Sequence, residues 1–204
     1  TAYNSAQAGD TIRMTADTTV QQLNTTGAVS ATDPIYKAVI IDLNGFTLTT
    51  TGGWGGMMLG GYASVINGTL LHKGNTCAIK AYEVDRLEDL TIIIESAKSN
   101  TGGVSLRDHN TMGKAHINTI KNVKMIGTGN YGIETLGQGD SANPTKPAID
   151  LIENVEIDSM KYGIDLSASI GTIKNSIISG SQSGIAIKNA NGFVVAINLV
   201  GDNE

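Results

Sequence analysis

The stretch NVEIDSMKYGIDL at residues 154–166 decides how this sequence folds, because two other parts of the chain repeat its pattern. The related stretches are NVKMIGTGNYGIET at residues 122–135 and NSIISGSQSGIAI at residues 175–187. Each stretch begins with Asn, continues with strand-forming residues, passes through a polar gap and reaches a Gly-Ile pair. Such self-similarity predicts a repeat architecture.

The Asn that opens each copy recurs through most of the chain. Asp takes its place once, and the seven predicted positions are Asn44, Asn67, Asp89, Asn122, Asn154, Asn175 and Asn198. Neighbouring positions are 21 to 33 residues apart. A period in the low twenties, lengthened by occasional insertions, indicates a solenoid.

Each copy contains three short strand candidates, exemplified by residues 148–152, 155–157 and 163–166. Asn tolerates a left-handed backbone and bonds neighbouring main-chain groups, so it suits a tight corner. Corners that repeat in successive coils would stack their side chains into a ladder about 4.8 Å apart. We therefore predict an all-β, single-stranded parallel β-helix of about seven coils with an asparagine ladder. A β-sandwich is the alternative, but it gives no reason for the same residue at every corner.

Composition narrows the possible functions. Charged residues make up 16% of the chain, Gly is abundant at 25 residues, and Pro is rare at 3. The net charge of -5 leaves no basic stripe, so we expect no nucleic-acid partner. No apolar run approaches the roughly 20 residues of a membrane span. With one cysteine, Cys77, and neither a CxxC nor an HExxH motif, the sequence predicts no metal and no cofactor.

The motifs IIDLNGFTLTT (40–50) and AGDTIRMTAD (8–17), with the repeated NV-x-I…GI units, resemble right-handed parallel β-helices of the pectate-lyase-like superfamily. The resemblance covers nearly the whole chain and implies a right-handed solenoid. It also implies that residues 2–9 (AYNSAQAG) form a short helix that caps the N-terminal end. We expect one β-helix domain over 1–204, as a module of a longer protein. The superfamily includes lyases, hydrolases, phage tailspikes and adhesins, so the fold alone does not give the function.

Alternation along the third strand of each copy predicts which side chains face outward. If Ile133, Ile164 and Ile185 point inward, their outward neighbours form one column across the coils. That column is Met58, Lys80, Ser105, Glu134, Asp165 and Ala186, and a second column two residues further on is Tyr82, Arg107, Leu136, Ser167 and Lys188.

Glu134 and Asp165 would then lie on adjacent coils, about 4.8 Å apart. Such a pair could hydrolyse or cleave a polysaccharide, with Glu134 as acid/base, Asp165 as nucleophile or stabiliser, and Arg107 orienting a sugar carboxylate. The alternative is a solvated face on which Arg107 and Lys188 offset two stacked acids. The catalytic strings of polygalacturonase-like β-helices (NTD, GHG, RIK) are missing here, which favours the non-catalytic interpretation.

Two insertions, near residues 108–114 and 137–147, follow the third strands of neighbouring copies, where protruding loops often carry binding specificity. Tyr131 and Tyr162 precede equivalent glycines and are expected to pack on each other. The candidate ligand-binding residues on the outer face and in the loops are Trp54, Lys80, Tyr82, His109, Asp140 and Lys188.

The sequence thus favours a non-catalytic module for adhesion, glycan binding or structural assembly, located outside the cell, on a cell surface or on a virion. The alternative is a polysaccharide-degrading hydrolase or lyase. The expected partner is a polysaccharide or cell-surface glycan. Residues 193–204 (FVVAINLVGDNE) contain apolar strand residues without an obvious cap, so self-association through the last coil is a further expectation.

Overall fold

The computed structural model describes residues 2–24, 37–96, 98, 100–107, 115–136, 146–158, 160–187 and 197–204. Apart from the four-residue helix α1 (Ala2–Ser5), the regular structure of these residues is β-strand in two sheets. The larger sheet contains β1 (Thr11–Arg13), β2 (Thr18–Val20), β4 (Ile40–Asp42), β5 (Thr47–Thr50), β7 (Ala63–His72), β9 (Glu83–Ile94), β11 (His116–Gly127), β13 (Ile149–Asp158), β15 (Ile170–Lys174), β16 (Ile177–Ile178) and β18 (Ile197–Val200). The smaller sheet contains β3 (Leu23–Asn24), β6 (Met57–Leu59), β8 (Cys77–Ala81), β10 (Gly102–Leu106), β12 (Tyr131–Thr135), β14 (Tyr162–Leu166) and β17 (Ser183–Ile187).

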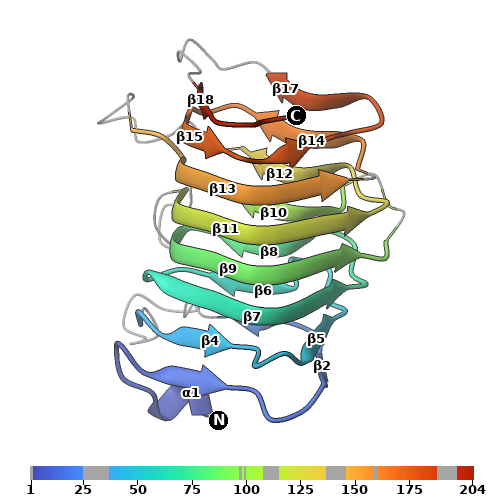
Figure 1. The fold of residues 1–204 in the computed structure, drawn as a ribbon. Coiled ribbons are helices and arrows are strands. Elements are labelled where there is room, and N and C mark those ends of the chain that lie inside the picture. The colour runs from blue at the N-terminus through green and yellow to red at the C-terminus, as the bar shows by residue number, and fades with distance from the viewer. Residues whose placement is uncertain are drawn as a thin grey trace.

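The chain alternates between the two sheets, which face each other (Figure 1). Strand order is β1-β4-β7-β9-β11-β13-β15-β18 in the larger sheet and β17-β14-β12-β10-β8-β6-β3 in the smaller one. Strands β9 and β11 pair in parallel, as do β10 and β12 on the opposite side. Each coil therefore stacks on the one before it, and the predicted all-β parallel solenoid is confirmed.

The predicted corners lie inside or beside the strands of the larger sheet, where the backbone bends. Six of the seven residues have a positive φ: Asn44 (54°), Asn67 (60°), Asp89 (54°), Asn122 (51°), Asn154 (53°) and Asn175 (49°). Asn and Asp reach this left-handed conformation more readily than most residues. The sequence predicted these six corners correctly.

The corner side chains bond from coil to coil, as a ladder requires. The Nδ2 of Asn122 donates to Oδ1 of Asp89 at 2.9 Å, and the Nδ2 of Asn154 donates to Oδ1 of Asn122 at 2.7 Å. In an earlier coil, the Nδ2 of Asn67 donates to Oδ1 of Asp42 at 3.2 Å. Amide and carboxylate groups on successive coils thus satisfy one another.

The seventh predicted corner, Asn198, is wrong. Asn198 lies within β18, opposite Thr172 of β15, and it is not among the residues with positive φ. Strand pairing continues to Lys174 opposite Val200, so Gly201 (φ 78°) is the residue that faces the Asn175 corner. The last repeat is shifted by three residues, and glycine, which has no Cβ, takes the left-handed position.

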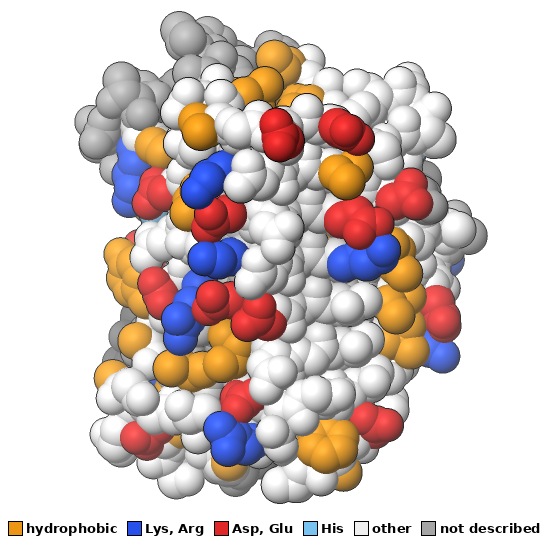
Figure 2. Space-filling view, viewed as in Figure 1, with side chains coloured by type: hydrophobic (Ala, Val, Ile, Leu, Met, Phe, Trp, Pro, Cys, Tyr) orange, Lys and Arg blue, Asp and Glu red, His pale blue; other side chains and the backbone are white. Residues whose placement is uncertain are grey.

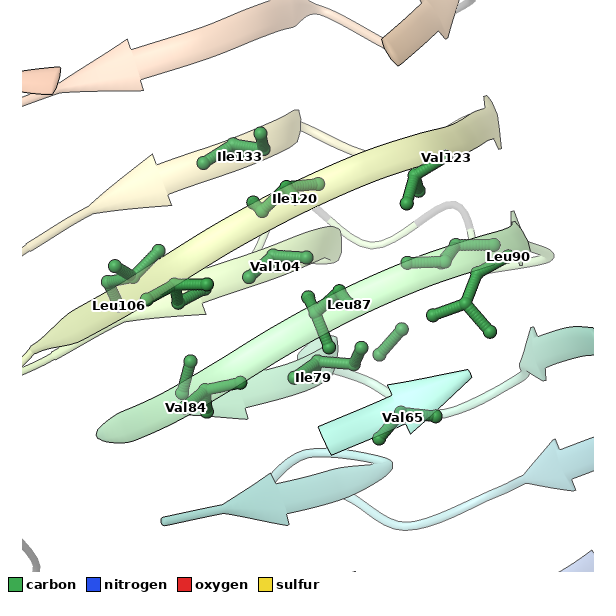
Figure 3. Close-up of a cluster of buried hydrophobic side chains, with 14 of the residues drawn as sticks. Val65, Ile79, Val84, Leu87, Leu90, Val104, Leu106, Ile120, Val123 and Ile133 are labelled. Atoms are coloured by element: carbon green, nitrogen blue, oxygen red, sulfur yellow. The ribbon is translucent and has the colours of Figure 1, made fainter. Parts of the chain in front are cut away.

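Aliphatic side chains fill the space between the sheets (Figure 3). Leu87 pairs in register with Ile120, and Ile120 with Ile152, and all three are completely buried. Burying such a side chain contributes about 1.5–3 kcal/mol. One like residue above another in successive coils gives a continuous core along the solenoid axis.

The outer face of the larger sheet carries charges of both signs (Figure 2). Glu153 accepts from Lys121 at 3.1 Å and from Lys174 at 2.9 Å, one on each neighbouring coil. These hydrogen bonds, from Lys174 first and then Lys121, lower the pKa of Glu153. Charges of opposite sign on neighbouring coils therefore pair with one another on this face.

The two ends of the described solenoid differ. At the N-terminal end, Ala6 belongs to the core, Tyr3 packs against it, and the Nζ of Lys37 donates to the Ala6 carbonyl at 2.6 Å. A helix therefore occurs within the predicted range 2–9 and adjoins the first coil, but it is limited to Ala2–Ser5. In the last described coil, Ile187 is 64% exposed and Leu199 is 59% exposed.

Among the described residues, no helix has both the length and the apolar character that crossing a bilayer demands.

Candidate functional site

The outer face of the smaller sheet contains the column that the sequence predicted. Met58 pairs in register with Lys80, and this pairing continues through Ser105, Glu134, Asp165 and Ala186. All six predicted members lie in register. Six neighbouring strands of the smaller sheet therefore place different polar and apolar side chains at one repeated position.

A depression of about 470 Å³ opens on this face across neighbouring coils. Its lining includes Trp54, Lys80, Ser105, Arg107, Tyr131 and Glu134. We call it the Trp54 depression. It brings together four of the residues singled out in the sequence: Trp54 from the loop before β6, Lys80 from β8, Arg107 after β10, and Glu134 from β12.

One side of the Trp54 depression is an aromatic ring beside a lysine. Trp54 is 77% exposed, and the Nζ of Lys80 lies 5.0 Å from the centroid of its ring, within cation–π range. The Lys80 stem runs beside Gly55, whose φ of 131° suits glycine. Burial lowers the pKa of Lys80, and the charge of Arg107 acts in the same direction.

The other side is built from two hydroxyls beneath a carboxylate. Tyr131 is 5% exposed and Ser105 is 4% exposed. The Oγ of Ser105 donates to Oε2 of Glu134 at 3.3 Å, and the Tyr131 hydroxyl lies within hydrogen-bonding reach of both side chains, with Glu134 as an acceptor for its proton. Burial raises the pKa of Tyr131, and the nearby Cys77 and Glu134 add to the increase, so the phenol remains a proton donor near neutral pH.

The position of Tyr131 depends on a missing side chain in the coil before it. Gly102 lies in register with Tyr131, and a Cβ added to Gly102 would overlap the tyrosine ring. In the same column, Cys77 lies one coil before Gly102, and Tyr162 lies one coil after Tyr131. The glycine in this column therefore makes room for the ring of Tyr131.

Asp165 is the predicted catalytic partner, but the structure separates it from the depression. It pairs in register with Glu134, as predicted, yet it is 2% exposed and does not line the depression. The predicted alternative, a solvated face with two stacked acids, is therefore wrong for Asp165. Ser105, in the same outward column, is similarly buried, so an outward direction does not ensure contact with solvent.

Tyr82, another predicted ligand-binding residue, does not line the depression. Tyr82 is 3% exposed, and burial raises its pKa. His109, Asp140 and Lys188 lie outside the described residues. No group of three His, Cys, Asp or Glu side chains suited to a metal ion occurs in the part of the chain that the structure describes.

Sequence reasoning missed the role of Tyr131 and Gly102 in this site. Tyr131 does pair in register with Tyr162, as expected, but the Tyr131 hydroxyl lies beside the side chains of Ser105 and Glu134. Aligning the repeats would have placed Gly102 opposite Tyr131. The hydroxyl contacts depend on how the ring tilts, which the repeat pattern does not specify.

A second polar ladder was also missed. Asn118 donates to Oδ1 of Asp85 at 3.0 Å, and its own Oδ1 lies 3.1 Å from Nε2 of His116. The same His116 nitrogen lies 3.3 Å from Oδ2 of Asp150. This network joins three coils near the start of their long strands. The polar groups of this network pair with one another, and none of its residues lines the Trp54 depression.

Comparison of the chain with protein-family models, with curated proteins and with solved structures gave no match.

Proposed function

We propose that the chain is a non-catalytic β-helix module that binds a saccharide in the Trp54 depression. The observation that carries this proposal is the 77% exposed ring of Trp54 at the edge of a depression that also contains Lys80, Arg107 and Glu134. An aromatic ring offers an apolar face on which a sugar ring can stack, and charged side chains offer donors and acceptors for its hydroxyls. We further propose that the module belongs to the pectate-lyase-like superfamily and acts outside the cell, on a cell surface or on a virion.

The burial of Asp165 favours binding over catalysis. Hydrolysis by a carboxylate pair needs both groups beside the scissile bond. Among the described residues that line the depression, Glu134 is the one carboxylate. It can accept hydrogen bonds from a ligand, but its register neighbour Asp165 does not reach the same space.

A polysaccharide lyase or hydrolase is the second candidate, supported by the presence of Arg107 and Glu134 in one depression. In this alternative Glu134 is the acid/base and Arg107 orients the sugar chain. The Glu134→Gln variant separates the two proposals. Loss of product formation with retained binding would establish the enzyme.

Trp54 is the only tryptophan in the sequence, so its fluorescence reports directly on the depression. We would titrate the protein with oligosaccharides of glucose, mannose, galactose and N-acetylglucosamine and with a uronic-acid polymer. Release of reducing ends and of unsaturated products would be assayed in parallel. We expect at least one member to change the fluorescence in a saturable way, without product formation.

Trp54→Ala is expected to weaken binding about fivefold to tenfold, because stacking on an aromatic ring contributes about 1–1.5 kcal/mol. Binding to Trp54→Ala and to the control Trp54→Phe would be followed by calorimetry, since both variants lack the tryptophan fluorophore. Trp54→Phe is the matched control and should retain most of the affinity. If no saccharide binds, or if Trp54→Ala binds as well as the unaltered protein, the proposal is wrong.

A further inference from the structure

The hydroxyls beneath Glu134 suggest a role that goes beyond packing. A carboxylate on an open strand face normally rotates freely, and holding it in one orientation favours ligand binding because less conformational entropy is lost. Glu134 is instead contacted from below by Ser105 and by the Tyr131 hydroxyl, both on side chains that are almost completely buried.

The register explains how a tyrosine reaches this place. Tyr131 and Glu134 belong to the same strand, β12, while Ser105 and Gly102 belong to β10, one coil earlier. The ring of Tyr131 occupies the space above Gly102, which brings its hydroxyl to Ser105. Four residues on two strands therefore form one unit. Three of them line the depression, and of these three only Glu134 is not almost completely buried.

We propose that Tyr131, seated over Gly102, is a positioning residue that fixes the Glu134 carboxylate as an acceptor for ligand hydroxyls in the Trp54 depression. This inference rests on the proposed saccharide-binding function and specifies how the site recognises its ligand. A fixed carboxylate with two oxygens can accept hydrogen bonds from two neighbouring hydroxyls of one sugar ring. The ligand class is therefore a saccharide with a free vicinal diol, stacked on Trp54 and bonded to Glu134.

Tyr131→Phe tests the inference, because it keeps the ring over Gly102 and removes only the hydroxyl. Tyr162→Phe is the matched control, since Tyr162 is the register equivalent of Tyr131 one coil later and does not line the depression. Two quantities would be measured. One is the titration midpoint of the Glu134 side-chain carboxyl, by carbon NMR without ligand. The other is the affinity for the oligosaccharides described above and for their 2-deoxy or 3-deoxy methyl glycosides.

In Tyr131→Phe we expect the Glu134 midpoint to rise by about 0.5–1 pH unit, because a hydrogen bond to the ionised form has been removed. Affinity should fall about tenfold, whereas removing one hydroxyl of the diol from the ligand should cost this variant less than it costs the unaltered protein. Tyr162→Phe should change neither quantity. Gly102→Ala, which displaces the ring, should reproduce the loss of affinity if the variant folds.

The outcomes distinguish this inference from the proposed function. An unchanged Glu134 midpoint in Tyr131→Phe overturns the inference, whether or not saccharides bind. A raised midpoint with unchanged affinity also overturns it, because the fixed carboxylate then plays no part in binding. A raised midpoint in a protein that binds no saccharide supports the fixing of Glu134 by Tyr131 and refutes the saccharide-binding function itself.

Discussion

The corner column of the larger sheet and the outward column of the smaller sheet are built on the same coils but use sequence differently. At the corner, six coils carry Asn or Asp, all at a positive φ. In the outward column, successive coils carry Met58, Lys80, Ser105, Glu134, Asp165 and Ala186. The backbone geometry repeats in both columns, while the chemistry repeats in only one.

This difference separates the residues that build the solenoid from those available for binding. A corner residue must adopt one uncommon backbone conformation, and few residue types do so at low cost. A strand position makes no such demand, so its side chain can vary from coil to coil. A non-repeating cluster such as the Trp54 depression is therefore the part of the fold that structural requirements explain least.

The largest expected effect on stability comes from breaking the corner ladder. Asn122→Ala removes a donor to Asp89 and an acceptor for Asn154, and it places alanine at a φ of 51°. We expect the free energy of unfolding to fall by about 2–4 kcal/mol, measured by urea denaturation.

Two controls accompany this measurement. Asn122→Gly restores conformational freedom and should lose about half as much stability, since only the hydrogen bonds are missing. Trp54→Ala, in the depression, should change stability by no more than about 0.5 kcal/mol. Equal losses at Asn122 and Trp54 would refute the division between structural and binding columns.

The second-largest expected effect on stability concerns the interior, where the side chains of the larger sheet are mostly aliphatic. His72 is an exception: it is completely buried, in register between Thr50 and Ile94, and its Nδ1 lies 2.9 Å from Oγ1 of Thr50. Burial lowers the pKa of His72 from 6.5 to about 4. Between these two values the unfolded chain binds this proton and the folded chain does not, so the free energy of unfolding falls as the pH decreases.

Between pH 7 and pH 5 we expect His72 to account for a loss of about 2 kcal/mol in the free energy of unfolding. The measurement is urea denaturation at both pH values, for the unaltered protein and for His72→Leu. The variant should lose less stability over this interval, because it lacks the proton acceptor and keeps every other titrating group. Identical pH dependence in the two proteins would contradict the prediction.

The smallest effect tests where the corner column continues in the last described coil. Gly201→Ala should lower the free energy of unfolding by about 1–2 kcal/mol, because alanine is strained at a φ of 78° and its Cβ would overlap the Asn175 side chain. Asn198→Ala is the matched control, and it removes an exposed side chain whose Nδ2 lies 3.4 Å from Oγ1 of Thr172. It should change stability by less than about 0.5 kcal/mol. The reverse ranking, measured by thermal or urea unfolding, would restore Asn198 as a corner.

The sequence predicted more of the fold than of the candidate site. Asn122 and Asn154 could be identified as corners because their residue type, spacing and flanking strands agree. Asn198 failed because a coil near the end of the described solenoid keeps the composition of the repeat but is shifted in register. The site was recovered in part: Trp54, Lys80, Arg107 and Glu134 were named individually, but their contact with Tyr131 over Gly102 was not foreseen.

The sequence by itself determined the coil, because the direction of a side chain relative to its own strand follows from the alternation of residues. This alternation predicted the outward column from Met58 to Ala186, and the recurring Asn predicted the corners. Only the tertiary structure decided which outward residues reach solvent, since exposure depends on side chains that neighbouring coils and loops contribute. For this reason Glu134 lines a depression, while Asp165, one coil later in the same column, is buried.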